Sequence, residues 1–400
     1  MSDVNLLLNN GIENIYPSKE FLTNLLLGQK KLKVYFGVDP TGEMQLHHTV
    51  PLRKLRQFQD LGHKVVLLIG SFTAMIGDPT GKSKTRVPLT HEQVLENSSN
   101  YTKYANKILD TVKNPYEVVY NHDWLEKLTF VEIIKLSSNF TVSQMIERDM
   151  FQERLKNNLP IGLHEFLYPL MQGYDSVVLD VDVEIGGTDQ TFNMLAGRKL
   201  VENYLNKEKC VVTTPLLTDS NGKKTSTSDG TGIPLNLSAN DTYGKVMSLP
   251  DTLMLNIFKL CTRFTVDEVV KLELRLNDGE NPIIIKKILA YEVVSLFHGD
   301  EDACLARENF EKTVQHKELP HDIPERIMES GGRMDVSDLL LATELVDSKS
   351  DARRMITQNA VSYFIDDNEV LVTEIHMNID IKNGMILKLG KRRFLRLIVS

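Results

Sequence analysis

Residues 33–70 read KVYFGVDPTGEMQLHHTVPLRKLRQFQDLGHKVVLLIG, and this stretch indicates the fold class. Lys33 to Val38 is short and rich in β-forming residues, and the turn DPTG follows it. Val50 to Leu61 has apolar residues at helical spacing and ends before Gly62, a plausible helix C-cap. Val65 to Gly70 is a continuous apolar run, as expected of a strand buried on both faces. Strands that alternate with helices predict an α/β fold with a parallel sheet, which binds ligands at the carboxyl ends of its strands.

Two further apolar runs extend this pattern toward the middle of the chain. Residues 176–185 and 210–217 are predicted to be strands of the same kind. The predicted α/β domain therefore covers residues 1–235, with an insertion at about residues 90–165.

The second half of the chain has a different character. From about Asp241 the patterns are those of amphipathic helices, which predict a helical domain over residues 236–330. Gly331-Gly332 is a plausible flexible joint. Residues 333–400 then open with helical patterns and end in short strands, which predicts a small α+β domain.

Composition places the chain among globular proteins, with 42% hydrophobic and 25% charged residues. No stretch approaches the roughly 18 apolar residues of a membrane helix. The N-terminus lacks a basic start followed by an apolar core, so we expect a cytoplasmic protein. The three scattered cysteines predict neither disulfides nor a metal site. Because the formal net charge is −8, any affinity for nucleic acid must come from a local basic patch such as residues 382–396.

Two polar motifs follow the first two predicted strands. In YFGVDPTGEMQLHH, His47 and His48 lie just ahead of a helix, where a side chain can donate to phosphate, although an ordinary loop with two histidines is the alternative. In MIGDPTGKSKTR the glycines are too close for a nucleotide-binding P-loop, since Gly77 precedes Gly81 by four positions. Asp78 in this motif is a candidate ligand for an ammonium group.

Three more motifs occur later in the chain. In YPLMQGYD, a phenol, an amide and a carboxylate share one helical face, which favours a polar ligand over a core helix. In EIGGTDQTF, Asp189 is placed to accept from a ribose hydroxyl, or the segment is a simple turn. The stretch SNGKKTSTSDGTG, residues 220–232, has the composition of a phosphate-contacting loop and equally that of an ordinary flexible loop.

These motifs, in this order, resemble those of the bacterial tyrosyl-tRNA synthetases, a class I family. LRQFQDLGHKVVLLIGSFTAMIGDPTGKSKTR, TVSQMIERDMF, YPLMQGYDS and GGTDQTFN are close to family signatures. Residues 337–396 resemble an S4-type RNA-binding domain. The resemblance implies a Rossmann-like catalytic domain, a helical anticodon-binding domain, an S4 tail and a homodimer. It also implies ATP with Mg²⁺ as substrate, no protein-bound metal, and L-tyrosine and tRNA(Tyr) as the other substrates.

The resemblance also assigns roles to residues. Tyr35 and Asp175 would hold the tyrosine hydroxyl, Asp78, Tyr168 and Gln172 its ammonium, and Gln190 would lie near its carboxylate. The ATP-binding residues would be Gly37, Asp39, Thr41, His47, Gly187, Asp189 and Lys223. Of these, Gly187 and Asp189 would contact the ribose. The catalytic positions would be His48, Lys224 and Thr227. The RNA-binding residues would be Arg353, Arg354, Lys391, Arg392 and Arg393.

Two phosphate motifs depart from the family pattern. Where the family has His-x-Gly-His, this chain has Gln45 for the first His and His47 for the Gly, while His48 keeps the last His. A second alignment makes His47 the first His and deletes the two middle residues. In both alignments the Gly is missing, and a side chain there should obstruct adenine. In the Lys-Met-Ser-Lys-Ser loop, Thr227 replaces the Lys that would stabilise the leaving pyrophosphate.

Three interpretations follow. The first is an active tyrosine–tRNA ligase. The second is a weakened or non-catalytic paralogue that binds tyrosine and RNA. The third is an enzyme that uses tyrosine or tyrosyl-tRNA in another reaction. The tyrosine pocket, whose residue types are intact, does not separate them.

Overall fold

A computed structural model describes residues 3–80, 89–218, 231–312, 323–328, 332–365, 368–390 and 393–399. The chain forms two compact units. Unit 1 comprises Met1–Leu237 and Ser248–Phe297, and unit 2 comprises Ser238–Met247 and His298–Ser400. The three-domain division from the sequence stays a prediction. Within the described residues, no helix is long and apolar enough to cross a membrane.

A six-stranded sheet forms the centre of unit 1. Its strand order is β1-β6-β5-β2-β3-β4, and all neighbouring pairs are parallel except β1 with β6. This confirms the predicted parallel α/β fold. The strands are β1 (Asn14–Tyr16), β2 (Lys33–Val38), β3 (Lys64–Ile69), β4 (Glu117–Tyr120), β5 (Val183–Gly187) and β6 (Cys210–Thr214).

The predicted strand at residues 176–185 is wrong in its first half. Helix α10 (Tyr168–Leu179) continues through this segment and ends at Asp180, which has a left-handed backbone (φ 46°). Strand β5 begins only at Val183. Apolar residues continue from the end of the helix into the strand, so hydrophobicity alone does not distinguish the two elements.

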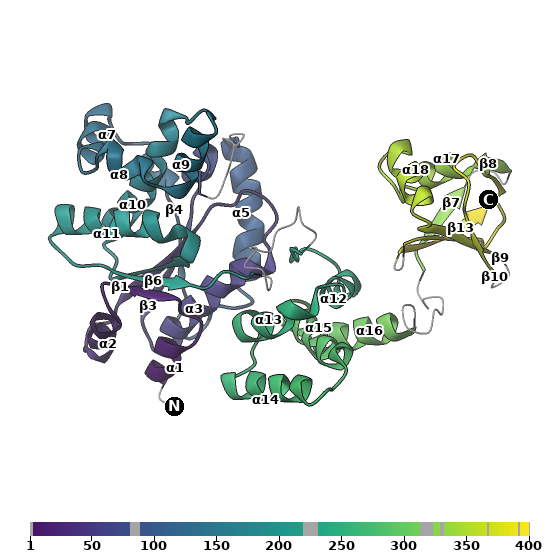
Figure 1. Cartoon of the computed structure of the whole chain (residues 1–400), viewed down its shortest axis with the longest axis horizontal. Coiled ribbons are helices and arrows are strands. Elements are labelled where there is room, and N and C mark those ends of the chain that lie inside the picture. Colours follow the sequence, from purple (N-terminus) through teal and green to yellow (C-terminus); the bar gives the residue numbers. More distant parts are fainter. Residues whose placement is uncertain are drawn as a thin grey trace. The chain divides into compact units, whose positions relative to one another are not determined.

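Helices cover the sheet (Figure 1). Helix α3 (Thr49–Asp60) connects β2 to β3, and Leu52, Leu55 and Phe58 on its inner face are almost completely buried. Helices α10 and α11 (Thr191–Leu205) pack against each other. Their approach needs glycine at the crossing, because a Cβ at Gly173 would lie 3.0 Å from the backbone nitrogen of Gly197.

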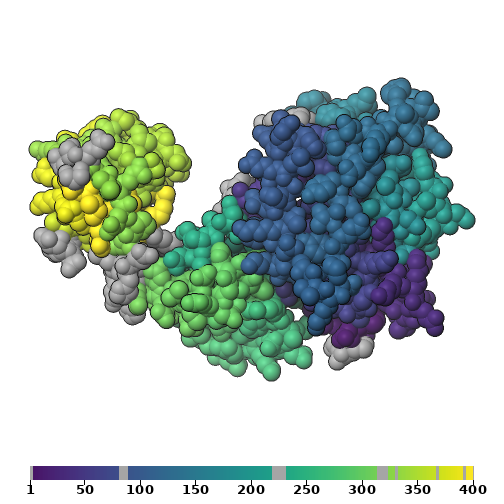
Figure 2. Space-filling view, turned by 180° about the vertical axis from the view of Figure 1, so that it is seen from behind, coloured from purple at the N-terminus to yellow at the C-terminus, as the bar shows by residue number. Residues whose placement is uncertain are grey.

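The remaining helices of unit 1 lie around this core. The helices before the inserted segment are α1 (Asp3–Asn9), α2 (Lys19–Leu27) and α4 (Thr73–Ile76). Those of the inserted segment are α5 (His91–Ala105), α6 (His122–Leu125), α7 (Phe130–Ser137), α8 (Val142–Ile146) and α9 (Asp149–Lys156). Residues of this blue segment form much of the face seen in Figure 2. The later helices are α13 (Met254–Cys261), α14 (Val266–Asn277) and α15 (Pro282–His298).

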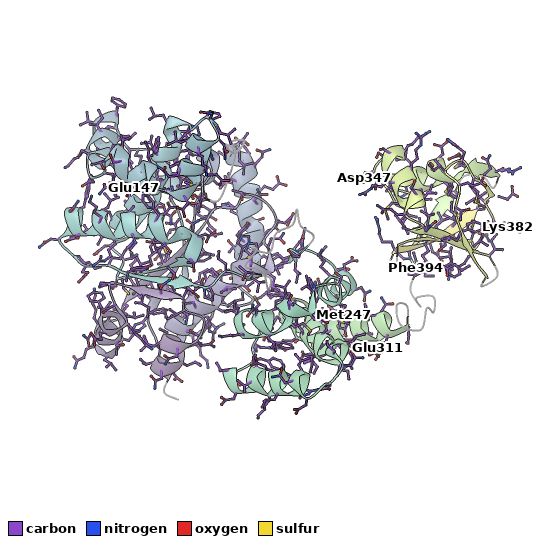
Figure 3. All side chains as sticks on the ribbon, in the orientation of Figure 1. Glu147, Met247, Glu311, Asp347, Lys382 and Phe394 are labelled. Carbon is purple, nitrogen blue, oxygen red and sulfur yellow. The ribbon has the colours of Figure 1, made fainter. Side chains whose placement is uncertain are left out.

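Unit 2 contains a helical part and an α+β part. Helices α12 (Ala239–Met247) and α16 (Asp300–Phe310) pack together, with the rings of Tyr243 and Phe310 5.4 Å apart. Helices α17 (Val336–Ala342) and α18 (Lys349–Thr357) pack with a five-stranded sheet of order β10-β9-β12-β13-β7. Phe394, labelled on that sheet in Figure 3, is buried against Phe364 and Ile386. The strands of this sheet are β7 (Glu325–Met328), β9 (Val361–Ile365), β10 (Asn368–Leu371), β12 (Ile386–Leu389) and β13 (Arg393–Val399). Strands β8 (Arg333–Asp335) and β11 (Asn378–Asp380) pair antiparallel in a separate two-stranded sheet.

Candidate active site

The carboxyl ends of β2, β3 and β5 and one face of α10 bring the predicted tyrosine-binding residues into one region. Tyr35 lies on β2, Asp78 follows α4 beyond β3, and Gln190 follows β5. Helix α10 supplies Tyr168, Gln172 and Asp175 at the predicted helical spacing. Hydrogen bonds join these elements, as described below.

Asp39 and Tyr168 form the first link. The Tyr168 hydroxyl donates to Asp39 Oδ2 at 2.7 Å, and Thr73 Oγ1 donates to Asp39 Oδ1 at 2.7 Å. Gly70 makes room for this carboxylate, because a Cβ there would lie 1.9 Å from Asp39 Oδ1. Burial raises the pKa of Tyr168 well above its usual range, and the neighbouring Asp39 and Asp78 add to that effect. Tyr168 is therefore a neutral phenol held in place by Asp39.

Asp78 and Gln190 form the second link. Asp78 Oδ2 accepts from Gln190 Nε2 at 2.7 Å, while Asp78 Oδ1 accepts from the backbone nitrogen and hydroxyl of Thr80 at 3.0 and 2.6 Å. Asn193 Nδ2 in turn donates to Gln190 Oε1 at 3.0 Å. Since a carboxylate has about four lone-pair sites, Asp78 keeps capacity for another donor.

Gln172 has an incomplete set of hydrogen bonds. Its Nε2 is 3.4 Å from Glu184 Oε1, which is a long contact. Its carbonyl oxygen, Oε1, is buried and has no hydrogen-bond partner among the residues that the structure describes. Leaving a buried acceptor unpaired costs about 1–3 kcal/mol. A ligand with a donor group would satisfy this oxygen.

Asp175 is a buried carboxylate held by two side chains that sequence reasoning missed. Trp124 Nε1 donates to Oδ1 at 2.8 Å and Asn121 Nδ2 donates to Oδ2 at 3.1 Å. Asn121 Nδ2 also lies 3.0 Å from Thr73 Oγ1, which connects Asp175 with the Asp39 network. Burial raises the pKa of Asp175 well above its usual range, and the two donors oppose that shift. Trp124 is the single tryptophan of the chain, which is the only sequence signal that marks it.

The hydroxyl of Tyr35 contacts Ser176 Oγ at 2.8 Å, and Tyr35 is 1% exposed. Burial raises the pKa of Tyr35 well above its usual range, with further contributions from Glu184 and Asp175. The sequence did not predict Ser176 or Glu184, because their partners lie far away along the chain. Tyr35 and Asp175 thus lie within electrostatic reach of each other, as a pocket for one hydroxyl requires.

The predicted phosphate side begins at the 3₁₀ turn Leu46–His48. His48 Nδ1 accepts from the backbone nitrogen of Gln45 at 2.9 Å, so the proton of a neutral His48 ring lies on Nε2. His47 and His48 have ring centroids 4.2 Å apart. The backbone nitrogen of Thr41 donates to the Asp39 carbonyl at 2.8 Å. Thr41 and His47 are both at least partly exposed.

Two glycines of the predicted ATP site differ in what they need. A Cβ at Gly187 would lie 2.5 Å from Asp189 Oδ1, so glycine lets Asp189 fold back over the end of β5. Gly37 is exposed, and a Cβ there would make only ordinary contacts at 3.5 Å or more. Packing therefore explains Gly187 but does not explain Gly37. The predicted catalytic and ATP-binding residues Lys223, Lys224 and Thr227 lie outside the described residues.

The predicted RNA-binding residues belong to unit 2. Arg353 and Arg354 are exposed on α18, and Arg354 pairs with Asp351. Helix α18 is capped by Ser348, whose Oγ accepts from the backbone nitrogen of Asp351 at 3.1 Å. Arg393 is exposed and donates to the Leu345 carbonyl at 3.0 Å. Lys391 and Arg392 lie outside the described residues.

Comparison with known proteins identifies the family. The model of the class I tRNA synthetases for tryptophan and tyrosine matches residues 27–315. A tyrosine–tRNA ligase of Thermotoga maritima is 42% identical over 98% of this chain and 96% of its own length. That of Idiomarina loihiensis is 43% identical over the same shares of both chains. The chain belongs to the tyrosine–tRNA ligase family.

Solved structures agree with this tyrosine–tRNA ligase fold. A C-terminally truncated mitochondrial tyrosyl-tRNA synthetase of Aspergillus nidulans is 24% identical, with a TM-score of 0.65 over 79% of this chain and 93% of that one. The enzyme of Archaeoglobus fulgidus, solved with L-tyrosine, is 20% identical, with a TM-score of 0.60 over 76% of this chain and 98% of that one. The family and the α/β synthetase fold predicted from the motifs are both confirmed. As a class I aminoacyl-tRNA synthetase, this tyrosine–tRNA ligase homologue uses an amino acid, ATP and tRNA.

Proposed function

We propose that this chain activates L-tyrosine with ATP to tyrosyl-adenylate and transfers the tyrosyl group to the 3′ end of tRNA(Tyr). The observation that carries the proposal is the unpaired, buried Gln172 Oε1 beside the Asp78 and Tyr168 links. An acceptor oxygen and a carboxylate are the groups that recognise an ammonium. The amino group of tyrosine would bind here, with its carboxylate near Gln190.

The other end of the substrate would lie against Tyr35 and Asp175. Asp175 would accept the phenol proton in addition to its bonds from Trp124 and Asn121, and Tyr35 would donate to the phenol oxygen. Phenylalanine has no hydroxyl to make either bond and would leave the Tyr35 proton without a ligand acceptor, which is costly in a buried site. Tyrosyl-tRNA synthetases are themselves the standard example of this discrimination, which reaches about 10⁵ against phenylalanine.

The chemistry is an in-line attack of the tyrosine carboxylate on the α-phosphate of ATP. No covalent enzyme intermediate is needed, so the protein contributes positioning and charge stabilisation. Asp189 would bind the ribose, and His48 would donate its Nε2 proton to a phosphate oxygen. Gly37, Asp39, Thr41, His47, Gly187 and Lys223 would complete the ATP site, and Lys224 with Thr227 the pyrophosphate loop. Mg²⁺ would enter on the phosphates of ATP as part of the substrate.

The test is tyrosine-dependent exchange of labelled pyrophosphate into ATP. We expect exchange with tyrosine and almost none with phenylalanine. Gln172→Leu should raise the KM for tyrosine, whereas Gln29→Leu, at an exposed glutamine after α2, should not. Tight tyrosine binding without exchange would refute the ligase assignment and favour the paralogue, an alternative that the comparisons do not support.

The homodimer that the family resemblance implies would use the outer face of α7 and α8. Val131 on α7 is 74% exposed, and Val142 on α8 is 70% exposed, beside exposed Phe130 and Ile134. Capping boxes at Thr129 and Thr141 stabilise the N-termini of both helices, which lie at the upper edge of unit 1 in Figure 1. An apolar surface of this kind marks an interface.

Light scattering would test this interface. Val131→Lys should shift the protein to monomers, whereas Val112→Lys, at an equally exposed valine outside α7 and α8, should not. An unchanged mass for Val131→Lys would place the interface elsewhere.

The exposed arginines of unit 2 would bind tRNA phosphates, and a cytoplasmic location would match these substrates.

A further inference from the structure

The Tyr35 hydroxyl is the end of a buried row of polar groups. Ser176 Oγ lies 2.8 Å from the Tyr35 hydroxyl, and Lys209 Nζ donates to Ser176 Oγ at 2.8 Å. Lys209 also forms an ion pair with Glu184, whose Oε2 lies 3.2 Å from Ser176 Oγ. All four residues are at most 2% exposed. None of these contacts is needed to build the sheet, so they require another explanation.

The fold makes specific room for this row. Gly197 on α11 faces it, and a Cβ there would lie 2.6 Å from Lys209 Nζ and 3.1 Å from Ser176 Oγ. Burial lowers the pKa of Lys209, and Glu184 acts in the opposite direction. Burying an ion pair is expensive and seldom adds stability over apolar residues of similar volume. A role in the neighbouring pocket accounts for its presence.

The chemistry of the groups fixes the direction of the hydrogen bonds. A lysine ammonium only donates, and an ionised carboxylate only accepts. Ser176 has one proton, and its contact with Tyr35 at 2.8 Å is normal for O–H···O, whereas that with Glu184 at 3.2 Å is long. Glu184 is already satisfied by Lys209. Ser176 therefore accepts from Lys209, and its single proton has two acceptors within reach, Tyr35 at 2.8 Å and Glu184 at 3.2 Å, of which the shorter contact favours Tyr35.

We propose that Lys209, Ser176 and Glu184 are positioning residues that direct the Tyr35 proton toward the hydroxyl of the bound amino acid. This inference rests on the proposed assignment of Tyr35 and Asp175 to that hydroxyl. The bonds then run in one direction, from Lys209 to Ser176, to Tyr35, to the ligand hydroxyl and to Asp175. Each group in this chain donates a proton to the next, and hydrogen bonds in such a chain strengthen one another. Glu184 balances the charge of Lys209.

The experiment compares tyrosine with phenylalanine in the full-length protein. Ser176→Ala should weaken tyrosine binding, measured by calorimetry, about two- to tenfold, which corresponds to one net hydrogen bond. Phenylalanine binding should stay the same, because phenylalanine has no hydroxyl to join the chain. In pyrophosphate exchange the KM for tyrosine should rise while kcat changes little. Ser176→Thr, which keeps the hydroxyl, should restore the tyrosine-to-phenylalanine ratio.

Two controls keep the outcome clear. Ser98→Ala removes an equally buried serine hydroxyl on α5, which donates to the Leu95 carbonyl, and should change neither ligand's affinity. If Ser176→Ala fails to fold, the double variant Lys209→Met and Glu184→Met removes the ion pair instead, and should lower the same ratio. An equal loss for both ligands, or an unchanged ratio, overturns the proposal. A wild-type protein that does not prefer tyrosine would instead overturn the pocket assignment itself.

Discussion

Replacing Trp124 with phenylalanine would remove one of the two donors that hold the Asp175 carboxylate. Trp124 Nε1 donates to Asp175 Oδ1 at 2.8 Å, and the ring packs against Leu125, Tyr168 and Met171. Phenylalanine keeps much of this apolar contact and has no donor. A hydrogen bond to a charged group is worth about 1.5–3 kcal/mol. Because this bond also exists without the ligand, its energy is the upper bound of the effect on binding, and tyrosine affinity should fall by at most about 10- to 100-fold, since each 1.4 kcal/mol is a factor of about ten.

The pH dependence of tyrosine affinity provides a second test of the same prediction. Burial raises the pKa of Asp175, and the Trp124 hydrogen bond lowers it, so Trp124→Phe should raise that pKa further. If ionised Asp175 accepts the phenol proton, tyrosine affinity increases as pH rises through this pKa. The midpoint should accordingly move to higher pH in the variant. In the free protein the raised pKa has the opposite consequence: the free energy of unfolding decreases as pH rises from the usual aspartate range to the folded pKa.

Calorimetric titration with tyrosine across pH measures both effects. The double-mutant cycle with Asp175→Asn separates the hydrogen bond from lost ring packing, because the effect of Trp124→Phe should shrink once the carboxylate is gone. The single tryptophan also makes the fluorescence of the otherwise wild-type protein a direct report of tyrosine binding at Asp175. Equal affinity and an equal pH midpoint for Trp124→Phe and wild type would refute the role given to this bond.

Three further predictions follow from separate parts of the molecule. Gly197→Ala should lower the free energy of unfolding by about 1–3 kcal/mol, measured by denaturant titration, because its Cβ would meet Lys209 Nζ at 2.6 Å, whereas Gly42→Ala, with nothing within 4 Å, should be neutral. Thr227→Lys should accelerate pyrophosphate exchange by supplying a charge for the leaving group, and an unchanged rate would mean that Lys223 or Lys224 already supplies it. Arg353→Gln should weaken tRNA binding and lower the slope of log affinity against log salt by about 0.7–0.9, whereas Arg326→Gln, at an arginine already paired with Glu344, should do neither.

The sequence identified the residues that lie at strand ends and on one helix face. Tyr35 and Asp39 flank the end of a strand whose turn is marked by DPTG, and Tyr168, Gln172 and Asp175 follow a helical period. These are local patterns, and the family motifs added the roles. Asn121 and Trp124 could not be found in this way, since they reach Asp175 from α6, more than 50 residues earlier in the chain. Lys209 resembles an ordinary surface lysine before a strand, and only the closure of α11 over β6 buries it.

The tyrosine side and the phosphate side of the site depend on different parts of the chain, and this separates binding from catalysis. The network from Asp39 to Asp175 is joined by hydrogen bonds among described residues of β2, α4, α6 and α10, and it involves neither altered phosphate motif. The changes at His47 and Thr227 should therefore act on ATP and on the transition state. Interactions made only in the transition state change kcat and leave the affinity for the amino acid unchanged. Tyrosine affinity alone is consequently a poor measure of ligase activity in this chain, and only the exchange rate reports whether the phosphate side still works.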